Sequence, residues 1–254
     1  GKANMEGFIQ YEAEDAMMKV YSSEALDYIV DETVQIMGGM GFSTEMPADR
    51  AYRDSRINRI FEGTNEINRL WNTDTVFKRG RKGKIDIFEK AEKVINDLDN
   101  IINSQFQSKG YYEDKAAHIE NFKKVALLLL QAAKTKFDRK LAMEQEISCF
   151  LSDVITYAYV AESAMLRVKK LESMGNKPED LMNLYKDMLN VFVYEASSVI
   201  RKNAMDTLFS IEDENVTEKY KRAIDRLTEV PGLNVKEARR RIADKMIEEN
   251  KYCF

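Results

Sequence analysis

Histidine and cysteine are scarce in this sequence of 254 residues. His118 is the only histidine, and Cys149 and Cys253 are the only cysteines. A histidine-dependent catalytic triad, a histidine-rich metal site and a four-cysteine zinc site are therefore excluded within the chain, and we predict no metal site. Two cysteines far apart in the sequence do not make a disulfide framework, which favours a reducing compartment.

A surplus of basic charge and a long apolar run are also absent. The 39 Lys and Arg residues against 43 Asp and Glu residues give a net charge of −4, which argues against a nucleic-acid-binding protein. The longest purely apolar run, residues 125–130, is too short to span a bilayer. No secretion signal opens the sequence, and Gly1 stands in helix-like sequence without an initiator Met, which we interpret as a processed or truncated start. We expect a cytoplasmic location in a bacterium, or a mitochondrial one in a eukaryote.

Only 11 glycines and 3 prolines interrupt the sequence. Long stretches rich in Ala, Leu, Met, Glu and Lys favour helix, and no alternation of period two indicates a strand. We predict an all-α protein with helices near residues 11–37, 47–58, 64–79, 85–107, 114–140, 141–174, 178–208, 217–228 and 235–250. Long helices joined by short loops are typical of an antiparallel helical bundle.

Residues 78–84 carry five basic side chains and two glycines. We interpret them as a solvated linker between a first helical unit, residues 1–77, and a helical bundle, residues 85–254. The alternative is a contact with an acidic partner or with acidic phospholipid at a membrane surface, worth about 1 kcal/mol for each basic residue.

Three glycines, at positions 38, 39 and 41, follow the first predicted helix. Glycine ends helices routinely, but three so close together also let the backbone approach a ligand. Arginines recur at every third position of the next predicted helix, at residues 50, 53, 56 and 59. Such a row is typical of surface ion pairs, here with Asp49 and Asp54, and an anion site is the alternative.

Glu62 follows the apolar Ile60 and Phe61 and precedes Gly63 and Thr64, so we expect it at a turn before a helix that Thr64 caps. A carboxylate in an apolar pocket has a raised pKa and becomes a better general base. A solvated loop glutamate is the plainer interpretation of this residue taken alone.

Together, these segments resemble the C-terminal end of the FAD-dependent acyl-CoA dehydrogenases. The resemblance rests on residues 35–42 (Gln-Ile-Met-Gly-Gly-Met-Gly-Phe), on Arg53-Asp54 and on Phe61-Glu62-Gly63-Thr64, in the order and spacing of that family. It covers about residues 11–75. Residues 85–254 look like the helical extension of the very-long-chain branch, through their length and helical pattern. The resemblance implies the end of the family's C-terminal helical domain followed by a second antiparallel bundle.

The resemblance also implies roles for the matched residues. Glu62 corresponds to the base that removes the α-proton of a fatty acyl-CoA, while the β-hydrogen passes as hydride to FAD and a trans-2-enoyl-CoA forms. The backbone N–H of Glu62 would help polarise the thioester carbonyl, and Gly63 would lie against the substrate. The resemblance implies that Thr64, Asn65 and Glu66 contact FAD. It also implies that a second stretch contacts the FAD of a neighbouring subunit in a homo-oligomer, namely Gln35, Ile36, Met37, Gly38 and Gly39. An electron-transfer flavoprotein is the implied electron acceptor.

The family's N-terminal helical domain, middle β domain and first C-terminal-domain helices would precede Gly1. We therefore expect the chain to be a C-terminal fragment of such an enzyme and to be inactive alone. The rival hypothesis is a non-catalytic helical module that binds other subunits or a membrane surface, which would leave the glycine segment and Glu62-Gly63-Thr64 without a purpose.

Overall fold

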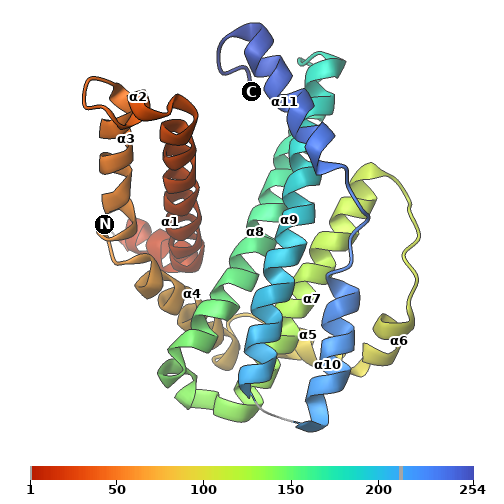
Figure 1. Ribbon diagram of the computed structural model, residues 1–254. Helices are drawn as coiled ribbons and strands as arrows, with labels where there is room; N and C mark the ends of the chain where they lie inside the picture. Colours follow the sequence, from red (N-terminus) through yellow and green to blue (C-terminus); the bar gives the residue numbers. More distant parts are fainter. Residues whose placement is uncertain (1, 212–213) are drawn as a thin grey trace. The chain divides into compact units, whose positions relative to one another are not determined.

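The computed structural model describes residues 2–211 and 214–254, and within these ranges it contains helices and connecting loops but no strand (Figure 1). The prediction of an all-α protein is confirmed. The helices are α1 (Lys2–Met37), α2 (Gly39–Phe42), α3 (Pro47–Arg56), α4 (Asn65–Arg81), α5 (Ile87–Asn96), α6 (Leu98–Asn103), α7 (Tyr111–Phe137), α8 (Gln145–Ser173), α9 (Glu179–Ile211), α10 (Glu214–Leu227) and α11 (Val235–Glu249). Two 3-10 turns, Ile57–Arg59 and Asp138–Met143, lie between them.

The contacts between helices group the chain into two compact units. Unit 1 contains residues 1–85 and 140–152, and unit 2 contains residues 86–139 and 153–254. Residues 140–152 belong to unit 1 because side chains of α4 bind the start of α8. The Thr73 hydroxyl donates to the carbonyl of Ser148 at 2.7 Å, and the Asn72 amide donates to the Ser152 hydroxyl at 2.9 Å.

Helix α1 packs against α3 and α4 in unit 1. Apolar residues at largely three- and four-residue spacings predict one buried stripe along this helix, made of Ala13, Met17, Val20, Tyr21, Tyr28, Ile29 and Ile36. Ala13, Met17 and Val20 are buried as predicted, whereas Ile29 and Ile36 are exposed. At about 100° of rotation per residue, these two positions lie roughly 140–160° around the helix axis from Ala13. The sequence pattern thus combined two different faces of one helix.

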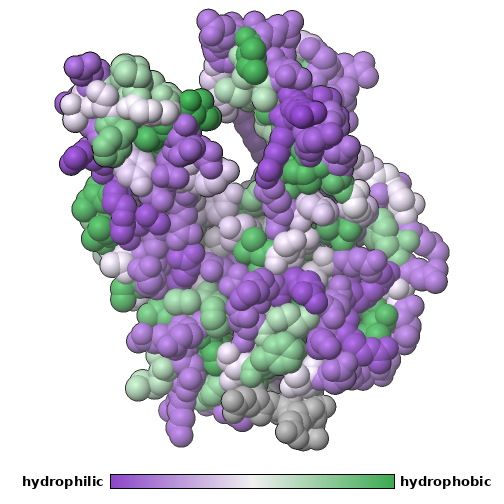
Figure 2. Space-filling model, viewed as in Figure 1, coloured by the Kyte–Doolittle hydropathy of each residue, from purple (hydrophilic) through white to green (hydrophobic). Residues whose placement is uncertain are grey.

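The turn from α1 into α2 depends on glycine at position 41. A Cβ atom added there would lie 2.7 Å from the carbonyl oxygen of Val34 and 2.8 Å from the Cβ of Met37. Helix α2 therefore packs directly on the last turns of α1, and only glycine allows this approach. Apolar atoms are visible at the surface around α2 in Figure 2, and the exposed side chains there include Ile36, Met40 and Phe42.

Unit 2 is a helical bundle in which α7 packs against α5, α9 and α10 (Figure 1). Its fully buried side chains include Phe122 and Leu128 of α7, Val154 of α8, Ile200 of α9 and Ile224 of α10. Each such side chain contributes about 1.5–3 kcal/mol by leaving water, so this core stabilises the unit. The short connections reverse the chain between long helices, as expected for an antiparallel bundle.

The structure differs from the sequence expectation between residues 85 and 110. The single predicted helix 85–107 is two helices, α5 and α6, which meet at Asp97. The Asp97 carboxylate accepts a hydrogen bond from the Asn100 side chain at 2.7 Å, which is typical of a local turn rather than of a helix interior. Residues 104–110 then run without helical structure to the start of α7.

Candidate active site

Glu62 and Gly63 lie in the loop between the 3-10 turn Ile57–Arg59 and α4, at the turn that the sequence predicts. Their backbone φ angles are 55° and 77°, so both residues adopt the left-handed region. Glycine tolerates this conformation, but a residue with a Cβ atom does not adopt it without cost. Strained backbone of this kind occurs at functional sites, where the surrounding structure enforces it.

Two side chains hold this loop through its carbonyl groups. The Asn68 amide donates to the carbonyl oxygens of Glu62, Gly63 and Thr64, at 3.3, 2.8 and 3.0 Å. The Lys19 ammonium donates to the carbonyl of Gly63 at 2.7 Å. Within the described residues, the backbone N–H of Glu62 donates to no acceptor in the chain. The carbonyl side of the loop is therefore fixed by the protein, while this N–H is available to a ligand.

Lys19 also connects the loop to a buried polar network. Its ammonium donates to the Asn65 side-chain oxygen at 2.7 Å, and the Asn65 amide donates to Ser23 at 2.9 Å and to Glu24 at 3.1 Å. Burial lowers the pKa of Lys19, although the carboxylates of Glu66, Glu24 and Glu62 oppose this shift. The network joins the start of α4 to the middle of α1.

Arg69 of α4 completes this connection with a two-pronged ion pair. Its two terminal nitrogens bind the two carboxylate oxygens of Glu24 at 2.7 and 2.9 Å. Lys19, Glu24, Asn68 and Arg69 were not found by sequence reasoning. The partners of Lys19, Glu24 and Arg69 lie 41 to 46 residues away in sequence, and no local spacing signals such pairs. Asn68 binds carbonyls four to six residues away.

A groove with a volume of about 510 Å³ lies beside Glu62 in unit 1. Helices α1 and α4 line it with the apolar side chains of Phe8, Ile9, Ile67 and Trp71. All four of these side chains are exposed, and so is Glu62. Glu12, Asp15 and Lys19 also line the groove, so within unit 1 Glu62 stands at the edge of an open, partly apolar groove rather than in an enclosed pocket.

The three residues after Gly63 have different environments. The Thr64 hydroxyl accepts from the backbone N–H of Ile67 at 3.3 Å, so Thr64 caps α4 as the sequence predicts. Asn65 is only 2% exposed, and its side chain is directed to the network with α1. Glu66 is exposed, and its own backbone N–H and the Thr64 hydroxyl lower its pKa.

The residues from Gln35 to Gly39 form the end of α1 and the turn that follows. Gly38 ends the helix with a φ of 60°, and its N–H donates to the carbonyl of Gln35 at 3.2 Å. Gln35, Ile36, Gly38 and Gly39 are exposed, and Met37 is half-buried. No atom would lie within 4 Å of a Cβ added at Gly38 or Gly39, so the backbone of this turn is open to a ligand.

The arginine row of α3 and the following turn makes two ion pairs. Arg53 binds Asp49 at 3.5 Å, which confirms one expected pair, and Arg59 binds Asp27 of α1 at 3.0 Å, which the sequence did not indicate. Among the residues that the structure describes, no cluster of His, Cys, Asp and Glu is suited to a metal ion. No described helix is long and apolar enough to cross a membrane.

Comparison with known proteins identifies two matching regions. Residues 2–75 and residues 121–224 each match a family described as acyl-CoA dehydrogenase, C-terminal domain. A Bacillus subtilis protein described as "Probable acyl-CoA dehydrogenase" is 39% identical over 214 residues, which are 84% of this chain and 35% of that protein. The very long-chain specific acyl-CoA dehydrogenase of Bos taurus mitochondria is 31% identical over 226 residues, or 87% of this chain and 30% of that protein.

A solved structure is similar over most of the chain. The acyl-CoA dehydrogenase of Bacillus anthracis, crystallised in complex with FAD, superposes with a TM-score of 0.88 and 35% identity over 95% of this chain and 40% of its own. The chain spans about a third of the length of the two relatives above. Because both matched regions belong to the same kind of domain, and the relatives align along most of the sequence, the chain belongs to the acyl-CoA dehydrogenase family through its C-terminal domain.

Proposed function

We propose that this chain contributes the catalytic base to the α,β-dehydrogenation of a fatty acyl-CoA to a trans-2-enoyl-CoA. The observation that carries the proposal is the Glu62-Gly63 loop. Its strained backbone is held through its carbonyl groups, while the Glu62 carboxylate and N–H are left available. A carboxylate and a backbone N–H on one residue can act on the same thioester, the carboxylate on the proton of the α-carbon and the N–H on the carbonyl oxygen.

In this mechanism the Glu62 carboxylate accepts the proton from the α-carbon of the thioester. The Glu62 N–H donates to the thioester carbonyl oxygen and stabilises the negative charge that develops there, as oxyanion-hole donors do. Gly63 presents no side chain, so the substrate can lie close to the backbone. Lys19 and Asn68 act as positioning residues, because they fix the loop carbonyls and thereby the direction of the N–H groups.

FAD is the cofactor that the family implies, and the residues of this chain fit it in part. The open backbone at Gly38 and Gly39, beside the exposed Gln35 and Ile36, is suited to contact with a large flat ligand. Met37 is half-buried and would support this strip. When bound, FAD supplies the oxidant that accepts the β-hydrogen with its electron pair.

The start of α4 offers further contacts with FAD through Thr64 and Glu66. Asn65 would contribute its backbone alone, because its side chain is occupied by Lys19, Ser23 and Glu24.

The very-long-chain branch is supported by the bovine very-long-chain enzyme, which is 31% identical over 87% of this chain. The human very-long-chain enzyme aligns over 70 residues and the human short-chain enzyme over 69, each 27% of this chain, so the support rests on the bovine match. We propose that the exposed apolar side chains around α2 lie in contacts between subunits of a homo-oligomer, and that an electron-transfer flavoprotein is the electron acceptor.

Membrane contact by residues 78–84 has less support, since Lys78 pairs with Asp74 and Arg79 with Glu12 inside unit 1.

The isolated chain is inactive in this proposal. Glu62 stands at an open groove, and removal of a weakly acidic proton needs a site from which water is excluded. Incubation of the purified chain with FAD and fatty acyl-CoA of several lengths should therefore yield no enoyl-CoA. Measurable turnover by the chain alone would contradict this part of the proposal.

The central test is Glu62→Gln in the FAD-loaded enzyme that contains this sequence. Loss of a general base lowers turnover by about 10²–10⁴-fold, and the flavin absorbance should be retained. Glu45→Gln, at another exposed glutamate of unit 1, is the matched control and should leave turnover unchanged. A Glu62→Gln enzyme that retains a tenth or more of the activity would refute the assignment.

A further inference from the structure

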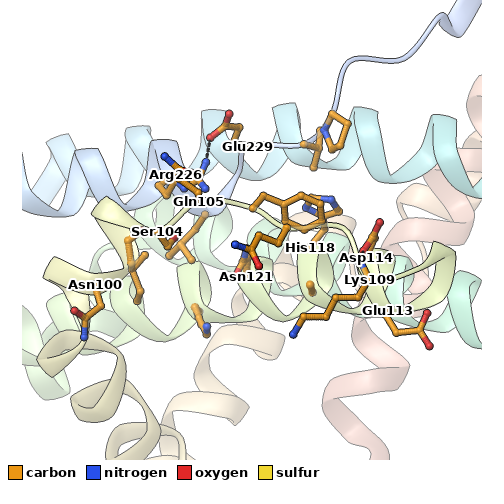
Figure 3. Close-up of a pocket in the computed structure, with 18 of the residues that line it drawn as sticks. Asn100, Ser104, Gln105, Lys109, Glu113, Asp114, His118, Asn121, Arg226 and Glu229 are labelled. Atoms are coloured by element: carbon orange, nitrogen blue, oxygen red, sulfur yellow. Dashed lines mark hydrogen bonds and ion pairs between the residues drawn. The ribbon is translucent and has the colours of Figure 1, made fainter.

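Residues 104–110, which we call the strap, connect α6 to α7 in unit 2. The strap borders a groove with a volume of about 890 Å³, between the first turns of α7 and the end of α10. Figure 3 shows His118 of α7 within this groove, next to Asp114 and Lys109. The function proposed above makes no use of this groove or of the only histidine in the chain.

The strap is anchored to α7 by one carboxylate. Asp114 accepts a hydrogen bond from the Ser108 hydroxyl at 2.5 Å and another from the backbone N–H of Lys109 at 2.8 Å. These hydrogen bonds lower the pKa of Asp114, with the Ser108 hydroxyl as the largest cause. Asp114 therefore stays ionised under mildly acidic conditions.

A second contact joins the strap to the imidazole ring of His118. The Phe106 ring stacks on it with a centroid distance of 4.6 Å and an interplanar angle of 20°. His118 is 2% exposed, and its Nδ1 has no hydrogen-bond partner among the described residues. Burial, and secondly the Lys115 ammonium, lower the pKa of His118, while Asp114 opposes them. The ring is therefore neutral at pH 7.

Asp114 and His118 are four residues apart on one helix, so their side chains are neighbours on the same face of α7. An imidazolium at position 118 would attract the Asp114 carboxylate, which now holds the strap. It would also be poorly accommodated between the Phe106 ring and the helix, because burial disfavours the charged form. Protonation of His118 therefore competes for the carboxylate that anchors the strap and makes the burial of the ring under Phe106 unfavourable.

Other ionisable groups near His118 lie on several elements. Lys115 and Asp114 belong to α7, and the strap contributes Lys109. A second pocket, of about 240 Å³, also has His118 in its lining. The remaining ionisable groups that line the groove or this pocket are Asp97, Tyr111, Glu113, Lys124, Tyr194, Arg226 and Glu229. Glu229 is already paired with Arg226, so Asp114 is the carboxylate placed to bind the imidazolium.

We propose that residues 104–110 form an acid-released strap, closed over α7 while His118 is neutral and opened when His118 takes up a proton and binds Asp114. Opening exposes the floor of the groove beside α7. Since one proton is taken up, the open population rises by at most about tenfold for each unit that the pH falls. The rise begins at a pH above the ordinary histidine value of about 6.5, because pairing with Asp114 stabilises the imidazolium in the open strap.

Hydrogen exchange of the full chain at pH 7.5 and pH 5.0 tests the proposal, after correction for the intrinsic exchange rates. We expect the protection of the Lys109 amide, which donates to Asp114, to fall at least threefold at pH 5.0, while amides 155–165 of α8 keep theirs. His118→Phe retains an aromatic ring for the stack but cannot titrate, so its strap should stay protected at both pH values. Unchanged wild-type protection, or a pH response of His118→Phe equal to that of the wild type, would overturn the proposal.

Two further variants separate the anchor from the switch. Asp114→Asn removes the carboxylate, so the strap should exchange faster already at pH 7.5 and respond less to acid. The neighbouring Glu113→Gln is the matched control and should behave as the wild type. Because His118 is the only histidine, labelling histidine gives one NMR signal that needs no assignment, and the protonation of His118 can be followed through it. If His118→Phe does not fold, a wild-type Lys109 amide whose protection does not follow the protonation of His118 between pH 7.5 and pH 5.0 refutes the switch by itself.

Discussion

Replacing Asn65 with alanine should destabilise unit 1 and loosen the Glu62 loop. The Asn65 side chain is 2% exposed and exchanges hydrogen bonds with Lys19, Ser23 and Glu24, at distances of 2.7 to 3.2 Å. Each partner keeps one other contact: Lys19 with Gly63, Ser23 with the carbonyl of Val20, and Glu24 with Arg69. The loss is therefore that of three hydrogen bonds without a newly isolated charge. At about 0.5–1.5 kcal/mol each, and more where a charged partner is involved, the unfolding free energy should fall by about 2–4 kcal/mol.

Urea unfolding followed through Trp71 measures this loss. Trp71 is the only tryptophan and lies on α4, so its fluorescence reports on unit 1. With a slope of about 1–3 kcal/mol per molar urea, the midpoint should fall by roughly 1–2 M. Asn100→Ala, which removes an exposed asparagine from unit 2, should leave the Trp71 transition in place. If the unfolding free energy of Asn65→Ala falls by less than about 1 kcal/mol, the network contributes little to stability and does not hold the Glu62 loop rigid.

Two other measurements probe unit 1. Gly41→Ala should lower the Trp71 unfolding midpoint by the equivalent of about 1–3 kcal/mol, because its Cβ would lie 2.7 Å from the carbonyl of Val34. Gly39→Ala, with open space around it, should be nearly neutral, and equal effects of the two would contradict the packing argument. Because the pKa of Glu66 is lowered in the folded state, its stabilising effect is complete above about pH 4.5 and is lost as the pH falls through that lowered pKa. Glu66→Gln should reduce the loss of unfolding free energy below about pH 4.5. An unchanged loss would mean that other carboxylates cause it.

The sequence predicted those features that local rules control. The α4 cap at Thr64 and the helix stop at Gly38 depend on the conformational preferences of a few adjacent residues, and the structure has both. Asn234 with Glu237 three residues later has the spacing of a capping box at the last predicted helix, and the Asn234 side chain does accept from the N–H of Glu237 at 3.2 Å. The stop of the helix at Asp97 was missed, because an Asp that forms a turn and an Asp on an exposed helix face look alike in one sequence.

Apart from Asn68, the parts of the site that were missed depend on tertiary contacts. Lys19 reads as one more lysine on an exposed helix face, yet its ammonium binds Gly63 and Asn65, more than 40 residues away. The resemblance implies that Asn65 contacts FAD, whereas its side chain binds Ser23 and Glu24 of α1. Adjacent positions at a helix start point in different directions, so a motif shared along the sequence does not give its members the same environment.

Lys19 and Asn68 matter for the site because the backbone of Glu62 is strained. Left-handed backbone costs an ordinary residue about 1–2 kcal/mol, so an isolated loop would relax and reorient both the carboxylate and the N–H. Asn68 binds three successive carbonyls, and Lys19 binds the middle one, so the strained geometry is enforced from one side only. The opposite side keeps its donors and its carboxylate for a ligand. The position of the base thus depends on a lysine and an asparagine that carry none of the proposed chemistry, and changes at either residue should lower the rate of proton removal while Glu62 is still present.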